Sequence, residues 1–257
     1  MTRDRGATLI ELMTALAIIG LTAAGAYQLL AGHLHHLARR EAAVERRQEG
    51  RAALALLARE LRLAGFPTRP DPVCHAMAGG VEVEPAAIRF LANLHGVATT
   101  LAAPASPGDT ALVVPDDRRI LAGGLTVSPG SVFSARDVIY LHDLAGDQAE
   151  CHRLDRPGAS GRIALAAADP VRRAFPAGSR IEVINLVRYA YAPAARQLTR
   201  SVDGASQAVA DSVAAAGFSR QGRLVGAVIT LAPPDVAMAG LVDVQVAMRN
   251  SPETEHE

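Results

Sequence analysis

The feature that most constrains this chain is a long segment without charged residues near its N-terminus. No Asp, Glu, Lys or Arg occurs from Leu12 to Gly32. Because a helix rises about 1.5 Å per residue, this run can cross the ~30 Å hydrocarbon core of a bilayer. Arg3 and Arg5 precede the run, and Arg39 and Arg40 follow it, which favours a cytoplasmic N-terminus by a small margin. The sequence therefore predicts a membrane-spanning helix.

The carboxylate of Glu11 lies one turn inside the start of this apolar stretch. A charged group facing lipid costs on the order of 2.5–3.5 kcal/mol or more at full depth, so Glu11 requires water or a partner. In one interpretation it lies at the interface and its side chain reaches water. In the other, cleavage between Gly6 and Ala7 creates an α-amino group, which on one subunit can neutralise Glu11 of the next.

The residues Gly6-Ala7-Thr8-Leu9-Ile10-Glu11-Leu12-Met13, after a short basic leader, resemble the start of type IV prepilins and type II secretion pseudopilins. The resemblance implies that prepilin peptidase cuts between Gly6 and Ala7, that Ala7 is methylated, and that Glu11 directs subunit docking. It also implies inner-membrane lipid and other minor and major pilins as partners, a head in the periplasm, and an extracellular filament after assembly. Most family members have Phe where this chain has Ala7, a departure that concerns methylation and leaves cleavage intact.

The same segment permits a different interpretation, an ordinary secretory signal. Ala24-Gly25-Ala26 is a small-residue site of the kind that signal peptidase accepts. Cleavage there would release a periplasmic enzyme or binding module that begins at Tyr27. The apolar region is long for a signal, however, and Glu11 interrupts it, so we favour the filament-subunit interpretation.

The helix is predicted to continue beyond the membrane, from about Thr8 to Ala64. No Pro occurs between Gly32 and Pro67, and the sequence between them is rich in strong helix formers. Gly65-Phe66-Pro67 then provides a stop, because glycine can adopt the left-handed cap and proline cannot continue the helix. Residues 51–66 are similar to the corresponding stretch of PilW-type minor pilins, which implies a role in a priming complex for pilus assembly. GspJ-type minor pseudopilins of type II secretion share this plan and are the alternative.

The second half of the helix carries an apolar stripe that is predicted to lie on a sheet. Its members have i, i+3, i+7, i+10 spacing: Leu54, Leu57, Leu61 and Ala64. The charged residues of this stretch are assigned mainly to the other faces: Arg46, Arg47, Glu49, Arg59 and Glu60.

From Pro67 onward, Gly and Pro separate short β-rich runs, which predicts an antiparallel sheet packed on the helix, an α+β fold. The expected strands are Ala87–Leu94, Ala111–Pro115, Asp137–Asp143, Glu150–Leu154, Arg180–Tyr191, Gln197–Val202, Leu224–Leu231 and Leu241–Met248. Leu94–Thr110 and Gly204–Gly222 are expected to be loops, the second with a short helix through Ala208–Ala216. The expected organisation is a leader at 1–6, a membrane and assembly half of the helix at 7–32, an amphipathic half at 33–65, and a head at 66–257.

Cys74 and Cys151 are the cysteines of the chain. In an oxidising compartment they can form one disulfide, which would tie the segment after the helix to a central strand. The alternative is two buried thiols. Because neither cysteine belongs to a C-x-x-C motif or has a His at ligand spacing, no metal site is predicted.

The sequence gives no positive sign of an enzyme, a cofactor site or a nucleic-acid interface. Gly217-Phe218-Ser219-Arg220-Gln221 lacks the last glycine of a nucleophile elbow, and no phosphate-binding glycine loop is present. His142-Asp143 and Cys151-His152 are neighbours on expected strands, where successive side chains point to opposite faces. Charge is balanced and aromatics are 4% of residues, without a basic stripe for nucleic acid. We therefore predict a structural, non-catalytic protein without a cofactor.

Overall fold

The structure is a computed structural model that describes residues 9–64, 73–74, 80–115, 119–120, 126–127, 133–143, 148–159, 161–222, 224–232 and 240–247. The expected cleavage site, Gly6 and Ala7, lies outside the described residues, and so does the helix stop at 65–67.

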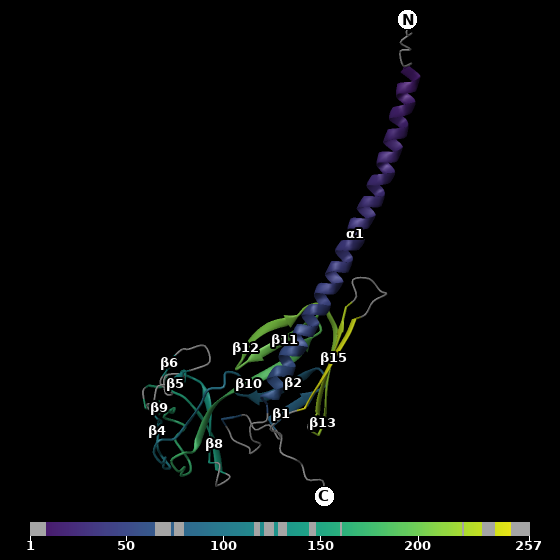
Figure 1. The fold of residues 1–257 in the computed structure, drawn as a ribbon. Coiled ribbons are helices and arrows are strands. Elements are labelled where there is room, and N and C mark those ends of the chain that lie inside the picture. Colours follow the sequence, from purple (N-terminus) through teal and green to yellow (C-terminus); the bar gives the residue numbers. More distant parts are fainter. Residues whose placement is uncertain are drawn as a thin grey trace.

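The N-terminal part of the chain forms a long helix, α1, from Leu9 to Arg62. Its 54 residues correspond to about 81 Å at 1.5 Å per residue. Figure 1 shows that its first half stands clear of the head, whereas its second half lies among the strands. The predicted continuation of the helix beyond the membrane segment is thereby confirmed.

The head contains antiparallel strands arranged in sheets. The strands are β1 (Val81–Glu84), β2 (Ala87–Ala92), β3 (Ala98–Thr100), β4 (Ala111–Val113), β5 (Arg119–Ile120), β6 (Thr126–Val127), β7 (Val138–Asp143), β8 (Gln148–Arg153), β9 (Arg162–Ala164), β10 (Arg180–Ala192), β11 (Gln197–Val202), β12 (Ala205–Ala210), β13 (Val213–Gln221), β14 (Leu224–Leu231) and β15 (Gly240–Ala247). The largest sheet runs in the order β1-β2-β10-β11-β12, with β3 and β7 also paired to β10, and β8 paired to β7. A further sheet has the order β13-β14-β15, and shorter pairs are β4-β9 and β5-β6.

Strand β10 connects two parts of the head. Its first residues, 180–184, pair with β7, and residues 185–190 pair with β2. One apolar core lies where the second half of α1 meets β2, β10, β11 and the β13-β14-β15 sheet. Another lies at the far end, around β4, β7, β9 and the start of β10. The head is therefore a helix-supporting lobe and a distal lobe that share one long strand (Figure 1).

The predicted α+β class is confirmed, since one long N-terminal helix packs on antiparallel sheets in a way that is consistent with a type IV pilin fold. The predicted bounds of Gln197–Val202 and Leu224–Leu231 match β11 and β14. The expected loop at Leu94–Thr110 contains the short strand β3. Strands β11 and β14 were predictable from the sequence because turn residues flank each of these apolar runs.

The expected loop at Gly204–Gly222, with its short helix at Ala208–Ala216, is wrong. This segment forms β12 and β13. Alanine favours helix, but here pairing with β11 and β14 overrides that preference. The missed signal is Asp203-Gly204, which joins β11 to β12 with positive φ angles of 50° and 93°. Two central residues with positive φ are the mark of a tight hairpin, for which Asp-Gly is a preferred pair.

We predict that Gly204→Ala lowers the free energy of unfolding by about 1 kcal/mol, because a side chain is disfavoured at positive φ. A Cβ at Gly204 would have no atom within 4 Å, so backbone strain is the cause. Gly217→Ala is the matched control, since that Cβ also meets nothing within 4 Å and Gly217 lies in β13. Urea unfolding should show no loss for the control, and equal losses for the two variants would contradict the turn assignment.

Candidate functional site

The first half of α1 exposes an apolar surface that the head does not cover. Every residue from Leu9 to Glu41 is exposed, including Leu21 at 76% and Leu29 at 78%. The helix is long and apolar enough near the N-terminus to cross a membrane, by length and composition. A contiguous apolar surface of this size in contact with water is unfavourable, so it marks a surface for lipid or for other helices.

The hydroxyl groups of the two threonines within this apolar half are satisfied inside the helix. The Thr14 hydroxyl donates to the carbonyl oxygen of Ile10 at 3.0 Å. The Thr22 hydroxyl donates in the same way to Ile18 at 3.0 Å. Backbone and side-chain donors in lipid must find partners locally, and this bonding to the preceding turn provides them. The surface is therefore suited to an apolar environment despite its threonines.

Glu11 lies in the first turn of α1 and is exposed. A carboxylate there is favoured by the unpaired N–H groups and the positive end of the helix dipole. Ala7, the predicted new N-terminus, stands four residues earlier in the sequence and outside the described residues. The structure thus presents Glu11 at the outer end of the exposed helix, where a group on another molecule can reach it.

The second half of α1 is fixed to the head through the predicted apolar stripe. Leu54, Leu57, Leu61 and Ala64 are all buried, with Leu57 and Leu61 at 0% exposure. They pack in the helix-supporting core with residues of β2 and β10, such as Phe90 and Tyr189. This half of the prediction is confirmed, and it explains how the helix can project rigidly from the head.

The assignment of Glu60 to an exposed face is wrong, because its side chain is buried in the helix-supporting lobe. Tyr189 Oη donates to Glu60 Oε2 at 2.7 Å. Arg200 donates from Nε to Glu60 Oε2 at 3.1 Å and from Nη2 to Oε1 at 2.6 Å. Tyr189 on β10 and Arg200 on β11 are direct cross-strand partners, so both side chains rise from one face of the sheet. The helix is thereby pinned to the sheet at its last turn.

This contact also shifts the ionisation of both partners. Burial, and secondly the hydrogen bond to Glu60, raise the pKa of the Tyr189 hydroxyl above its ordinary value. The same carboxylate raises the pKa of the Arg200 guanidinium through its hydrogen bond. Tyr189 therefore stays neutral as a donor and Arg200 stays charged.

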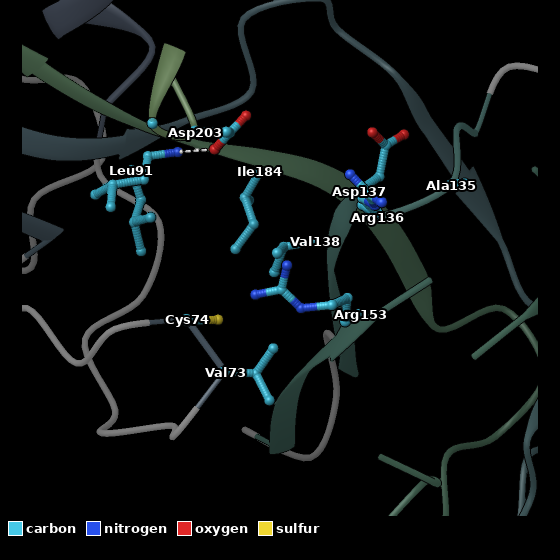
Figure 2. A pocket seen from close by; sticks show the side chains of 12 residues that line it. Val73, Cys74, Leu91, Ala135, Arg136, Asp137, Val138, Arg153, Ile184 and Asp203 are labelled. Atoms are coloured by element: carbon cyan, nitrogen blue, oxygen red, sulfur yellow. Dashed lines mark hydrogen bonds between the residues drawn. The ribbon is translucent and has the colours of Figure 1, made fainter. Parts of the chain in front are cut away.

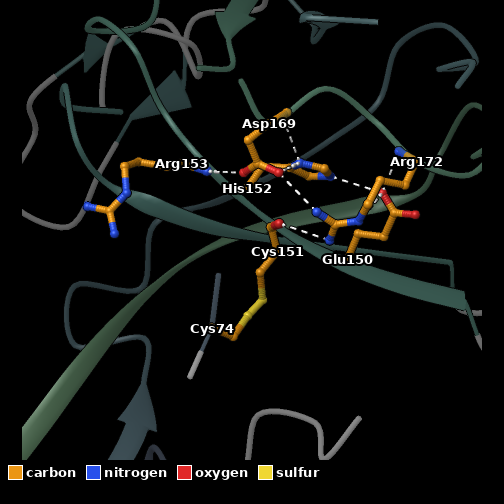
Figure 3. The surroundings of a disulfide bond; sticks show 7 residues. All are labelled: Cys74, Glu150, Cys151, His152, Arg153, Asp169 and Arg172. Atoms are coloured by element: carbon orange, nitrogen blue, oxygen red, sulfur yellow. Dashed lines mark hydrogen bonds and ion pairs between the residues drawn. A yellow bond between two sulfur atoms is a disulfide. The ribbon is translucent and has the colours of Figure 1, made fainter. Parts of the chain in front are cut away.

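Cys74 and Cys151 form a disulfide in the structure (Figure 3). Cys151 is on β8, and the bond closes a sequence separation of 77 residues. It lies in a small apolar cluster with Leu91, Tyr140 and Ile184. The disulfide thus attaches the segment that follows α1 to the distal lobe.

On the other face of β8, a buried polar cluster joins this strand to the segment that leads to β10. His152 is fully buried, with Nε2 at 3.1 Å from Glu150 Oε2 and Nδ1 at 3.2 Å from the Asp169 carbonyl oxygen. Arg172 Nη1 donates to Asp169 Oδ1 at 2.9 Å, and the Arg172 backbone N–H donates to Glu150 Oε2 at 2.8 Å. Glu150 and His152 share a face because they are two residues apart on a strand.

The expectation that Cys151 and His152 do not form a dyad agrees with this arrangement, since they face opposite sides of β8 (Figure 3). The partners of His152 were not predicted from the sequence. The pairing with Glu150 was accessible from strand periodicity, whereas the approach of Asp169 was not.

A cavity of about 480 Å³ lies beside the disulfide. Its apolar wall includes Leu91 and Ile184, and the Arg153 side chain extends into it (Figure 2). Asp137 and Asp203 also line it. Burial, with a smaller effect from the charge of Asp203, raises the pKa of Asp137, while the hydrogen bond from the Ser134 N–H opposes this. No Ser, Thr, Lys or His is among the described residues that line the cavity.

Comparison with known protein families gives a match at the N-terminus of the chain. Residues 1–27 match the family model described as the prokaryotic N-terminal methylation motif. No curated protein and no solved structure matches the chain. The motif implies processing by prepilin peptidase and assembly with other pilins, and the apolar N-terminal half of α1 fits a membrane anchor. Together with the fold, the match indicates a type IV pilin-like prepilin.

Proposed function

We propose that this chain is a structural minor pilin of the PilW type that takes part in initiating type IV pilus assembly. The observation that carries the proposal is the methylation motif at residues 1–27, at the exposed end of a helix whose other half is fixed to a β-rich head. In this proposal, residues 1–6 are a leader, 7–32 the membrane and assembly half, 33–65 the amphipathic half, and 66–257 the head.

In the proposed mechanism, cleavage between Gly6 and Ala7 exposes an α-amino group that is then methylated. The head stays in the periplasm while the apolar half of α1 stays in the inner membrane. On assembly, the exposed apolar surfaces of neighbouring helices pack together and leave the lipid. The positive N-terminus of one subunit lies against Glu11 of another, because an uncompensated carboxylate among apolar helices would be strongly unfavourable.

We expect N-terminal peptide mass spectrometry of the membrane-extracted protein to find a mature N-terminus at Ala7. This start should depend on co-expression of a prepilin peptidase. A start at Tyr27 would contradict the proposal and favour a periplasmic protein released by signal peptidase. An uncut Met1 in the presence of the peptidase would contradict the processing step.

Glu11→Gln should be processed normally but should fail to enter filaments, because the variant keeps the size of the side chain and removes its charge. Glu45→Gln, at an exposed position of the same helix outside the apolar run, is the matched control and should assemble. The readout is the fraction of subunit in sheared surface filaments.

Deletion of the gene for this chain then distinguishes the two filament systems. Loss of surface pili supports the minor pilin, whereas loss of protein export with intact pili supports a GspJ-type pseudopilin.

A further inference from the structure

The part of α1 between its uncharged run and the head, residues 33–41, forms what we call the neck. All of its residues are exposed, and Ala42 is the first residue of the helix that the head partly covers. At 1.5 Å per residue, the uncharged run from Leu12 to Gly32 spans about 31 Å. When α1 crosses a bilayer, the neck therefore begins at the depth of the lipid headgroups.

The side chains of the neck are separated into two arcs. Successive residues are about 100° apart around a helix, which places the basic and titratable cations within an arc of about 160°: His33, His35, His36, Arg39 and Arg40. The opposite side carries Leu34, Leu37 and Ala38, followed by Glu41 at the end nearest the head. Such segregation is typical of a helix whose apolar side enters the acyl boundary and whose cations face the headgroups.

We propose that the neck binds the anionic phosphate headgroups of the extracytoplasmic leaflet, and that its histidines make this binding stronger at acidic pH. The inference rests on the proposed membrane-held state of the subunit. Each cation near an anionic surface favours binding by roughly five-fold, and histidine side chains change their charge between pH 5 and 8. The neck contains three histidines beside two arginines.

The neck contains one carboxylate, Glu41, at its end nearest the head. Charged groups within five positions of the histidines on the same helix are Arg39, Arg40 and Glu41. Within the described residues, no strand packs against the neck, and the first half of α1 stands clear of the head (Figure 1). A subunit whose neck is bound to headgroups in this way would leave the membrane for a filament more readily at neutral than at acidic pH.

The experiment uses the full chain reconstituted in vesicles. The chain has no tryptophan, so Leu37→Trp places one fluorescent reporter on the apolar side of the neck. Quenching by acrylamide, an uncharged aqueous quencher, measures whether this side is buried in lipid. In vesicles containing phosphatidylglycerol, we expect the quenching constant to be at least about two-fold lower at pH 5.5 than at pH 8, and high salt should reduce the difference.

Two comparisons isolate the histidines. His33→Gln/His35→Gln/His36→Gln in the same reporter background should abolish the pH difference, whereas His95→Gln, at an exposed position of the head, should preserve it. Neutral phosphatidylcholine vesicles should show no pH difference. A wild-type neck that is insensitive to pH, or a difference that persists in the triple variant or in neutral vesicles, would overturn the proposal.

A second reporter distinguishes failure of the neck proposal from failure of membrane anchoring. Leu21→Trp lies in the middle of the uncharged run and should be protected from acrylamide at both pH values. An accessible Leu21→Trp would contradict the membrane-held state on which the neck depends. Protection there, combined with a pH-insensitive neck, would refute headgroup binding alone.

Discussion

Glu60→Ala is expected to lower the free energy of unfolding by about 3–5 kcal/mol. The substitution removes the hydrogen-bond acceptor of both Tyr189 and Arg200. Their donor atoms lie 2.6 to 3.1 Å from the oxygens of the Glu60 carboxylate. Breaking a buried ion pair by removing one partner is costly, because the remaining charge stays in a poorly solvated site. Arg200 is 17% exposed in its side chain, so water can relieve only part of this cost.

The measurement is urea unfolding of the full chain in detergent, followed by far-ultraviolet circular dichroism. Arg59→Ala is the matched control, because Arg59 is the preceding residue of α1 and is exposed; its loss should be within about 0.5 kcal/mol. Replacing the pair with apolar residues, Glu60→Leu/Arg200→Leu, should recover much of the stability, since no unpaired charge remains. A loss below 1 kcal/mol for Glu60→Ala would contradict the proposed role of Glu60 in fixing α1 to the head.

Loss of the disulfide is expected to lower the free energy of unfolding by about 4–5 kcal/mol. The chain-entropy model assigns this magnitude to a closed loop of 77 residues, because the cross-link restricts the unfolded chain. The loop contains β1 to β7 and part of β8, and its closure joins the segment after α1 to the distal lobe. Reduction should therefore destabilise both the segment that follows α1 and the distal lobe.

Cys74→Ala/Cys151→Ala is the variant of choice, because alanine introduces no polar atom at the buried Cys151 site. It should unfold at the same urea concentration as the reduced wild type and should not respond to a reducing agent. The reduced wild type should also show a larger dependence of its free energy on urea, since its unfolded chain exposes more surface. A double variant as stable as the oxidised wild type would show that the cross-link does not stabilise the head.

Much of the long helix and several strands were predictable because their signals are local. The uncharged run and the absence of proline predicted a helix from about Thr8 to Ala64, and α1 extends from Leu9 to Arg62. Spacing alone identified the stripe that includes Leu57 and Leu61. Periodicity and flanking turns are properties of neighbouring residues, so they can be read without knowledge of the fold.

The predictions that were wrong or stayed open concern contacts between residues that are far apart in the chain. Glu60 meets Arg200 across 140 positions, and only that contact makes burial of a charged helix residue tolerable. The alanine-rich segment of β12 and β13 has a local preference for helix, which the neighbouring strands overrode. His152 likewise contacts the carbonyl oxygen of Asp169 only because the distal lobe folds these two segments together.

By itself, the sequence determined the long helix, its uncharged half, the position of Glu11 and the alternation of the most regular strands, because each follows from the order of neighbouring residues. The tertiary structure alone decided that Cys74 meets Cys151, that β12 and β13 are strands, and that Glu60 is buried. These outcomes are set by long-range pairing and packing, in which the free energy of contacts between distant segments exceeds local conformational preference.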